Sequence, residues 1–298
     1  MGIVNPKHKT IGDRLTNVFL GCCVIFIIIV CIYPFWHVIM YSLSDSRAAM
    51  SGGVFLLPRS FTLDSYSMLM STQRIFNAMW NSIKKTLVGT SLAMVVTVLT
   101  AYPLSRGDLK GRRFFLLMIY FTMLFSSGII PTYIQIKNLG LLDTFWVYVF
   151  PGAMSAYNMF VLRNFFATIP DSLSESATLD EANPLQILTR IVLPLSKAAL
   201  ATIALYYVNS FWNSYMDGVL YVTSTRLELL QVYVRMLISL TGSLAAVGEV
   251  GDLSGRGVIT EDSIKMTVIA ISVIPVILFY LFLQKYFQKG VTVGAVKG

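Results

Sequence analysis

The sequence predicts an all-α membrane protein with six transmembrane helices, and three observations lead to this fold class. Hydrophobic residues make up 55% of the 298 residues and charged residues only 13%, and the mean hydropathy is +0.69, outside the range of soluble globular proteins. Six stretches contain no Asp, Glu, Lys or Arg and are long enough to cross roughly 30 Å of hydrocarbon as helices. Five of the six contain a proline, which membrane helices tolerate when neighbouring groups satisfy the freed carbonyl. We therefore expect kinked helices packed around a cavity.

The six predicted spans follow one another along a single transmembrane domain that covers residues 1–298. They are residues 18–43, 86–105, 114–136, 144–162, 198–216 and 266–284. The first span is too long for a signal peptide and no small-residue cleavage site follows it, so we expect it to remain a membrane helix. Another apolar segment, residues 236–248, is too short to span and rich in Gly, Ala and Ser, which favours a short or re-entrant helix.

Basic residues are unevenly distributed among the segments that connect the spans. Lys and Arg are denser in the N-terminal segment, the second and fourth loops and the C-terminal segment, with a cluster at residues 106–113. Because basic loops remain on the cytoplasmic side, both termini are expected to be cytoplasmic. Topology and lipid headgroups then account for the net charge of +8, and no nucleic-acid surface is expected. All three cysteines lie in the first span, where a thiol is a small hydrophobe, so neither a disulfide framework nor a metal site is expected.

The fourth loop, residues 169–197, is polar although it lies between two apolar spans. Ser172 is followed three residues later by Glu175, which fits the capping-box pattern of a helix start. A short helix is therefore predicted from about residue 173 to residue 179. Its acidic and small residues indicate a surface shaped for a cytoplasmic partner, although capping alone fits equally well with a loop that is merely ordered.

The same loop contains a second helix signal in the sequence Asn183-Pro184-Leu185-Gln186. Asn183 is a favourable cap, Pro184 fits the first helical position, where no amide donor is needed, and Gln186 stands at the reciprocal position. The second helix is expected to end before Pro194. A tight turn through residues 180–182 would join the two helices.

The segment resembles the EAA loop of the permease subunits of bacterial ATP-driven importers, a pattern of Glu-Ala-Ala, three residues, Gly, and a later Ile-x-Leu-Pro. The residues that match in type and order are Glu175, Ser176, Ala177, Asp180 and Ile191-Val192-Leu193-Pro194. Ser176 replaces the first Ala of the pattern and keeps its small volume. Glu181 stands where the family has Gly, which conflicts with any turn that needs a positive φ.

The resemblance continues from about Phe76 to the end of the chain and is closest to the carbohydrate-uptake group. It rests on Phe211-Trp212-Asn213, Leu230-Gln231 with Arg235, Gln284-Lys285-Tyr286-Phe287, Lys289-Gly290 and Gly294-Ala295-Val296-Lys297-Gly298. Within this group, the second permease of maltose-type importers is the general relative. The nearest branch handles oligosaccharides from polysaccharide breakdown.

The resemblance implies the type I ABC importer permease fold, with a cytoplasmic coupling helix, in the bacterial cytoplasmic membrane. It implies a transport subunit rather than an enzyme, with no catalytic or metal-binding residue. The chain lacks Gly-x-x-x-x-Gly-Lys-Ser/Thr, so ATP and Mg would be bound by a partner ATPase and this chain would bind no cofactor. The implied partners are a second permease subunit, two ATPase subunits, an external solute-binding protein or lipoprotein, membrane lipid and an oligosaccharide.

The resemblance also assigns roles to individual residues. The residues expected to dock on the ATPase are Glu175, Ser176, Ala177, Asp180, Glu181 and Asn183. The C-terminal tail, with Lys289 and Lys297, is expected to reach toward the ATPase, unless it is only a terminus whose lysines set the topology.

A sugar path needs polar groups and flat apolar faces at membrane depth. Asn209, Trp212 and Asn213 share one predicted face of the fifth span, where amides could bind hydroxyls and an indole could stack on a sugar ring. Tyr157 and Asn158 in the fourth span are further candidates. Asparagine in a span is also common as a link between helices. A uronate-containing oligosaccharide is one candidate substrate, given the basic residues expected on the outer side, Lys84, Lys85, Arg226 and Arg235.

Three other functions fit the sequence less well. A scaffold or a channel without coupling would leave the polar fourth loop unexplained. An ion-coupled secondary transporter usually carries ionisable residues deep within its spans, and the span centres here have none. An intramembrane hydrolase would need a catalytic motif, and the chain contains neither His-Glu-x-x-His nor Gly-x-Ser-x-Gly. Co-purification of an ATPase would separate these alternatives from the importer.

Overall fold

The computed structural model describes residues 11–53, 56–240 and 260–295. The regular secondary structure within these residues is helical, apart from one isolated bridge between Ser44 and Phe61. The all-α fold class is confirmed. The chain divides into two compact units. The first contains Met1–Ser71 and Ser243–Ile271, and the second contains Thr72–Gly242 and Ser272–Gly298.

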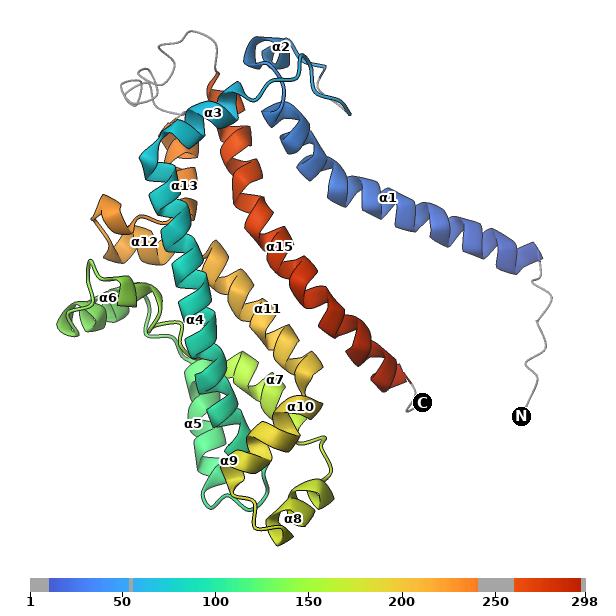
Figure 1. The fold of residues 1–298 in the computed structure, drawn as a ribbon, viewed down its shortest axis with the longest axis vertical. Helices are drawn as coiled ribbons and strands as arrows, with labels where there is room; N and C mark the ends of the chain where they lie inside the picture. The colour runs from blue at the N-terminus through green and yellow to red at the C-terminus, as the bar shows by residue number, and fades with distance from the viewer. Residues whose placement is uncertain (1–10, 54–55, 241–259, 296–298) are drawn as a thin grey trace. The chain divides into compact units, whose positions relative to one another are not determined.

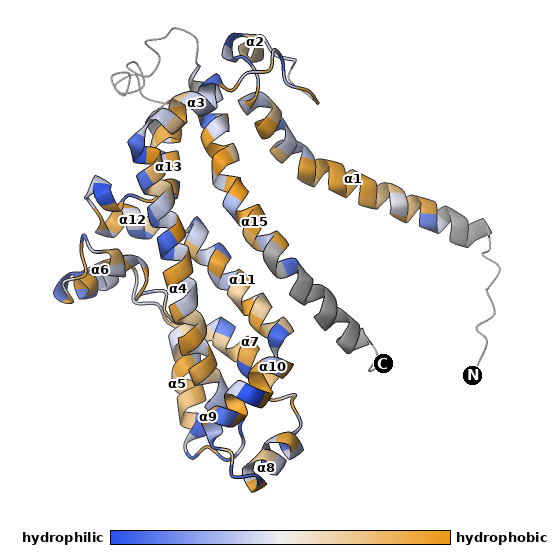
Figure 2. Cartoon of the chain, in the orientation of Figure 1, coloured by the Kyte–Doolittle hydropathy of each residue, from blue (hydrophilic) through white to orange (hydrophobic). Residues whose placement is uncertain are grey.

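The first unit contains α1 (Ile11–Ser42), α2 (Ser46–Met50), α3 (Asp64–Ser71) and the beginning of α15 (Glu261–Ala295). Most large apolar side chains of α1 from residue 18 to residue 39 are exposed, and Figure 2 shows this helix as hydrophobic along most of its length. A helix with apolar residues on all sides suits a lipid environment. The carboxylate of Asp45 caps α2 by accepting from the amides of Arg47 and Ala48.

The second unit contains the remaining helices, and Figure 1 labels the α-helices among them. They are α4 (Gln73–Ser105), α5 (Arg112–Leu124), α6 (Ile129–Asn138), the 3₁₀ helix η1 (Phe145–Tyr148), α7 (Ala156–Phe166), α8 (Asp171–Leu179), α9 (Pro184–Ile187), the π-helical turn η2 (Leu188–Val192), α10 (Leu193–Leu195), α11 (Lys197–Asn213), α12 (Met216–Tyr221), the 3₁₀ helix η3 (Thr225–Leu227), α13 (Leu230–Leu240) and the rest of α15.

The core of this unit forms where α4 packs against α7 and α11 (Figure 1). Ala93, Thr97 and Ala101 are fully buried and recur every four residues, so one face of α4 is lined by small side chains. Small residues let helices approach closely in membranes, where packing replaces the hydrophobic driving force. On α4 the same core extends to Leu104, and Ile187 and Val192 join it, so α9 and η2 pack beside the C-terminal end of α4.

Three of the predicted spans are single long helices. Thr16–Ser42, Gln73–Ser105 and Asp262–Leu281 are apolar and long enough to cross a membrane, and they correspond to the first, second and sixth predicted spans. The second helix begins at Gln73 instead of residue 86. Its additional turns carry polar and charged residues, and the inward-facing ones, such as Asn81 and Lys85, are buried against protein.

The third predicted span is broken into α5 and α6, which are bent by 115° relative to one another. The break contains Gly128, whose φ of 83° lies in the left-handed region that glycine adopts without strain. Charge and length alone predict one helix for residues 114–136. The Ser126-Ser127-Gly128 sequence is the local signal of the break.

The fourth predicted span is wrong as a single helix, and the fifth is shorter than expected. Within residues 144–162, η1 ends at Tyr148 and α7 begins only at Ala156, with Pro151 and Gly152 in the connecting loop. The fifth span, α11, ends at Asn213 because the next residue is extended, so Met216 begins α12 instead of continuing the face of α11. The pair formed by Pro184–Leu195 and α11 is bent by 86°. The described residues thus hold three single spans, or up to five if each bent pair counts as one.

The apolar segment expected at residues 236–248 is described only in part. Its beginning belongs to α13, an 11-residue helix from Leu230 to Leu240. The remainder of the segment lies outside the described residues.

Candidate functional site

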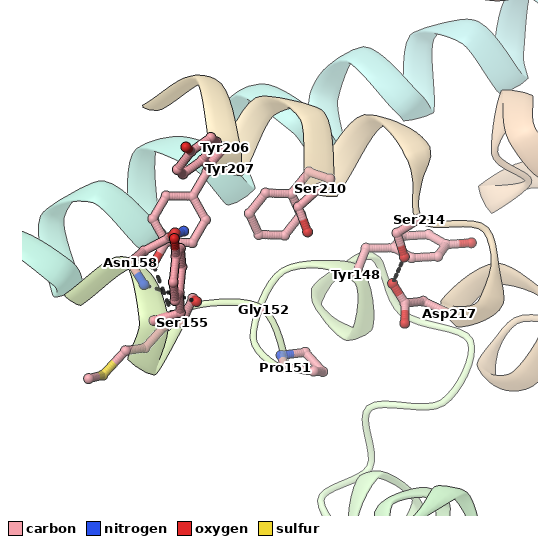
Figure 3. Close-up of a pocket in the computed structure, with 13 residues that line it drawn as sticks. Tyr148, Pro151, Gly152, Ser155, Asn158, Tyr206, Tyr207, Ser210, Ser214 and Asp217 are labelled. Carbon is pink, nitrogen blue, oxygen red and sulfur yellow. Dashed lines mark hydrogen bonds between the residues drawn. The ribbon is translucent and has the colours of Figure 1, made fainter. Parts of the chain in front are cut away.

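The break in the fourth predicted span forms one wall of a cavity of about 500 Å³, and α11 forms the opposite wall (Figure 3). This volume is within the range of sites that bind small ligands. The lining residues are rich in tyrosine and in hydroxyl and amide groups. They are Tyr148, Pro151, Gly152, Met154, Ser155, Tyr157, Asn158, Tyr206, Tyr207, Ser210, Phe211, Ser214 and Asp217.

Two glycines allow α11 to approach both the loop and α4. A Cβ atom on Gly152 would lie 2.9 Å from the ring of Phe211, and one on Gly89 of α4 would lie 2.7 Å from the same ring. No real Cβ comes that close to a carbon atom, so both positions require glycine unless Phe211 moves. The ring of Phe211 therefore lies between two backbones, and it keeps the loop close to α11.

The hydroxyl of Tyr207 joins three elements at the cavity wall. It lies 2.7 Å from the hydroxyl of Thr97 on α4, and it accepts a hydrogen bond of 3.0 Å from the backbone amide of Ser155. The side chain of Ser155 in turn caps α7 by accepting from the amide of Asn158. The start of α7 is thus fixed to α4 and α11. Tyr157 and Tyr206, by contrast, are 54% and 46% exposed, so their rings are accessible to a ligand.

A buried lysine lies behind the end of the cavity where α11 stops. The side chain of Lys85 is 1% exposed, and its ammonium group donates a 2.9 Å hydrogen bond to the carbonyl of Ser214. The carboxylate of Asp217 lies 3.6 Å from this ammonium group and also accepts from the Ser214 hydroxyl. The ring of Tyr148 lies 5.2 Å from the ammonium group, at cation–π distance. The charge of Lys85 is thus matched by Asp217, the only charged residue among those that line the cavity.

The structure separates the residues that the sequence analysis grouped as a sugar path. Tyr157 and Asn158 line the cavity, whereas Asn209, Trp212 and Asn213 are absent from its lining. Trp212 is buried, and its indole donates a 3.1 Å hydrogen bond to the carbonyl of Ser272 on α15, so it cannot stack on a sugar in this structure. Asn213 donates to the side chain and the carbonyl of Asn209, so these two amides bind each other on an exposed surface.

The α11 residues that do line the cavity were missed by the sequence analysis. Tyr206 and Ser210 lie one helical turn apart on α11, and Ser214 follows directly after the end of this helix (Figure 3). The spacing was visible in the sequence. Serine hydroxyls in membrane helices usually bond to their own backbone, however. They therefore indicated a ligand site less clearly than the side chains of Asn209, Trp212 and Asn213.

The predicted helix-turn-helix of the fourth loop is present, with one correction. Its first helix, α8, begins at Asp171 with Pro170 at the cap position and no side-chain cap, so the capping box predicted at Ser172 is wrong. The second prediction is confirmed, since Asn183 and Gln186 form both bonds of a capping box, each 2.9 Å long. The helical path then continues through Pro194 as η2 and α10 instead of ending before it.

The turn between the two helices has a positive φ, the conformation that a glutamate at position 181 was expected to disfavour. Glu181 has a φ of 60°, in the left-handed region. The amide of Glu181 donates to the carbonyl of Thr178, and the amide of Ala182 donates to that of Ala177, which together form a Schellman motif. A glutamate therefore occupies the position where glycine is favoured, and it strains the backbone.

The residues predicted to dock on an ATPase are accessible with one partial exception. Glu175, Ser176, Asp180, Glu181 and Asn183 are exposed, whereas Ala177 is half-buried and packs against the core of the second unit. The side chain of Leu179 at the end of α8 is 86% exposed, an unusual position for leucine. Of the tail, Lys289 lies within α15, and Lys297 lies outside the described residues.

These features define a class of protein, a multi-pass membrane protein with an internal polar cavity and a preformed helical segment exposed beyond its spans. The chain belongs to the family described as binding-protein-dependent transport system inner membrane components, whose profile matches residues 4–293. It is therefore a permease subunit and not an enzyme; in this family ATP hydrolysis is carried out by a separate ATPase.

Individual relatives agree with this assignment. The polygalacturonan/rhamnogalacturonan transport system permease protein YtcP of Bacillus subtilis (strain 168) is 40% identical over 96% of this chain and 99% of its own. Protein LplC of the same organism is 36% identical over the full length of both chains. A solved bacterial ABC transporter involved in the import of the acidic polysaccharide alginate includes a chain with a TM-score of 0.85 and 32% identity, and the match covers 95% of this chain and 100% of that chain.

Proposed function

We propose that this permease forms half of the translocation path of an ATP-driven importer of oligosaccharides derived from acidic polysaccharides. The observation that carries the proposal is the cavity between the loop after η1 and α11, with its accessible tyrosine rings and its hydroxyl and amide groups. Aromatic faces stack on sugar rings, and hydroxyl and amide groups exchange hydrogen bonds with sugar hydroxyls. The names of YtcP and of the alginate transporter support the substrate class.

The remaining components follow from the family and from what the chain lacks. A second permease subunit would complete the path, an external binding protein would deliver the sugar, and two ATPase subunits would bind ATP and Mg. This chain carries no phosphate-binding loop of its own. The basic segments, including residues 106–113, support an orientation with both termini and α8 on the cytoplasmic side.

The exposed surface of α8 and of the turn after it supports a coupling role. Small Ser176 and protruding Leu179 stand among the exposed carboxylates of Glu175, Asp180 and Glu181. The Schellman turn and the capping box hold this surface rigidly to the helices that reach the cavity. Nucleotide-dependent movement of a docked ATPase would then change the permease equilibrium through contacts that differ between its states.

None of the described residues that line the cavity is basic, so the cavity itself offers no cation to bind the carboxylate of a uronate. Lys85 is buried behind the wall and matched by Asp217, and the guanidinium of Arg235 stacks at 4.6 Å on the ring of Tyr215. Lys84 lies 5.2 Å from the ring of Trp80. We therefore propose that this cavity recognises sugar rings and hydroxyls, while carboxylate selection belongs to other parts of the importer.

The test uses residues that line the cavity and have accessible side chains. Tyr206→Ala and Ser210→Ala should each lower uptake of oligogalacturonate by up to about tenfold, because each change removes a contact or hydrogen bond to the sugar. Tyr280→Ala serves as the matched control, since Tyr280 is 50% exposed on α15 and does not line the cavity. Uptake by whole cells and co-purification of the ATPase would be measured together. Unchanged uptake in both cavity variants would contradict the proposed path.

A further inference from the structure

Two arginines from different helices meet at the C-terminal end of α4. The Nε atom of Arg112, at the start of α5, donates a 3.0 Å hydrogen bond to the carbonyl of Leu104, and the Nε atom of Arg163, on α7, donates a 3.1 Å hydrogen bond to the same oxygen. This carbonyl is in the last turn of α4, where helical carbonyls lack intrahelical donors. Cations near a helix C-terminus are favourable, so both arginines stabilise this end of α4.

One carbonyl cannot neutralise two positive charges. Because both Nε atoms bind the same oxygen, they lie within about 6 Å of one another, where like charges repel. Within the described part of the chain, neither arginine has a carboxylate within ion-pair distance. The other guanidinium nitrogens of Arg112 remain directed to no described acceptor, and Arg163 uses one of its own to reach Asn164. The site is therefore short of negative charge.

An apolar groove adjoins these arginines. It has a volume of about 400 Å³ and is lined by residues of the last turns of α4, of the first turns of α5 and of the chain between and beside them. The lining residues are Thr100, Pro103, Leu104, Leu109, Phe115, Met118, Ile119 and Met154. Leu104 is thus common to both features, since it is among the residues that line the groove and its carbonyl binds the two arginines. Figure 1 shows α5 alongside the end of α4.

We propose that this groove binds one acyl chain of an anionic phospholipid whose phosphate is held by Arg112 and Arg163. Guanidinium groups match phosphate oxygens in charge and geometry, and bind them more strongly than neutral donors do. The site lies at the C-terminal end of the candidate span Gln73–Ser105. Basic pockets between membrane helices bind anionic lipid headgroups. An amphiphile with a negative head and an apolar tail satisfies both halves of the site at once.

The bound lipid would link neighbouring helices. It would bridge α4, α5 and α7 next to α9 and η2, which pack on the same core. Occupancy should therefore stiffen the part of the molecule from which α8 projects, without any contact between the lipid and the cavity-lining hydroxyls.

The test compares lipid binding to the purified full-length chain by native mass spectrometry. With phosphatidylglycerol and phosphatidylcholine offered together, the wild-type chain should retain phosphatidylglycerol preferentially, and Arg112→Gln should reduce that preference by about tenfold. Arg113→Gln is the matched control, because it removes the same charge from the next residue, which is exposed. Equal loss in the two variants, or no preference in the wild-type chain, would overturn the proposal.

Two further experiments identify which part of the lipid the site recognises. Thr100→Trp fills the groove and leaves both arginines in place, so it should reduce binding of phosphatidylglycerol even if Arg112→Gln proves unstable. Excess inorganic phosphate should displace little phosphatidylglycerol if the acyl chain contributes, whereas complete displacement would show a simple anion site and overturn the lipid assignment. Loss of ATPase co-purification by Arg112→Gln with an unchanged lipid preference would instead assign the arginines to an acidic protein surface.

Discussion

Glu181 shows that a turn with a left-handed φ can form without glycine. A left-handed φ brings the Cβ of a non-glycine residue close to a backbone oxygen, which costs about 1 to 2 kcal/mol. The turn forms nevertheless, because the two Schellman hydrogen bonds and the capping box at Asn183 hold its two sides. The glutamate therefore changes the stability of the turn and leaves its geometry intact.

We expect Glu181→Gly to stabilise the protein by up to about 1 kcal/mol, because glycine removes the strain and only part of this gain is lost to the greater freedom of the unfolded chain. The free energy of unfolding in detergent would be measured. Asp180→Gly is the matched control, since Asp180 has a φ of −81° and glycine there should destabilise. If both substitutions lowered the stability alike, the strain at Glu181 would be disproved.

At the scale of elements, the Lys85–Asp217 pair fixes the place where α11 ends. Lys85 is on α4. Of its two oxygen partners, Ser214 lies in the break between α11 and α12, and Asp217 lies in the first turn of α12. A buried ammonium group that loses its partner retains most of its desolvation cost. The pair thus links the bend in the chain to the long helix of the core.

Asp217→Asn should therefore destabilise the protein by about 1 to 3 kcal/mol, less than for a fully buried pair because Asp217 is partly exposed to solvent. Lys85→Met combined with Asp217→Asn should cost less than the sum of the two single changes, because the double variant leaves no buried charge. Lys84→Met, at the neighbouring exposed lysine, should show no such coupling with Asp217→Asn. The free energies of unfolding would be compared between two double-mutant cycles, one with Lys85→Met and one with Lys84→Met. Strict additivity in both cycles would contradict an interaction between Lys85 and Asp217.

A second link between elements depends on pH. The Asp143 carboxylate accepts hydrogen bonds from the amide and the hydroxyl of Thr223 and from the amide of Ser224, so the loop before η1 is tied to the chain after α12. These hydrogen bonds, with the Thr223 hydroxyl foremost, lower the pKa of Asp143 below its ordinary value.

A lowered pKa in the folded state means that ionised Asp143 contributes stability above the ordinary pKa of about 3.9, and that this contribution disappears as the pH falls through the lower value of the folded state. Asp143→Asn should therefore reduce the unfolding temperature near neutral pH. On acidification below about pH 4, the unfolding temperature of this variant should fall less than that of the wild type. Thermal unfolding at several pH values checks this. A variant that follows the wild-type curve throughout would rule out the proposed linkage.

At the scale of the whole molecule, charge and length in the sequence predicted the helical membrane class and the positions of three long helices, α1, α4 and α15. They did not predict the breaks, because a charge-free stretch looks the same whether or not Gly128 or Pro151-Gly152 interrupts it. The cavity forms at one of these breaks, which explains why only Tyr157 and Asn158 among the expected path residues line it.

The α8–α9 segment was easier to predict because its determinants are local. Capping residues and small residues act within one or two turns, so the sequence identified the Asn183 capping box and the helix before it. The position of Trp212 depends on α15, which follows about 60 residues later, and periodicity along α11 could not reveal it. Distant packing thus decided which face of α11 meets the cavity.

We propose that a separate ATPase docks on the exposed surface of α8 and drives this permease. The most direct measurement is co-purification of the ATPase with the full-length permease carrying Ser176→Arg, because Ser176 is exposed and the change leaves the core intact. Gly107→Arg is the matched control, since a Cβ atom at this position would meet nothing within 4 Å. Ser176→Arg should lose the ATPase while Gly107→Arg retains it; full retention of the ATPase by Ser176→Arg would show that docking does not use this surface of α8.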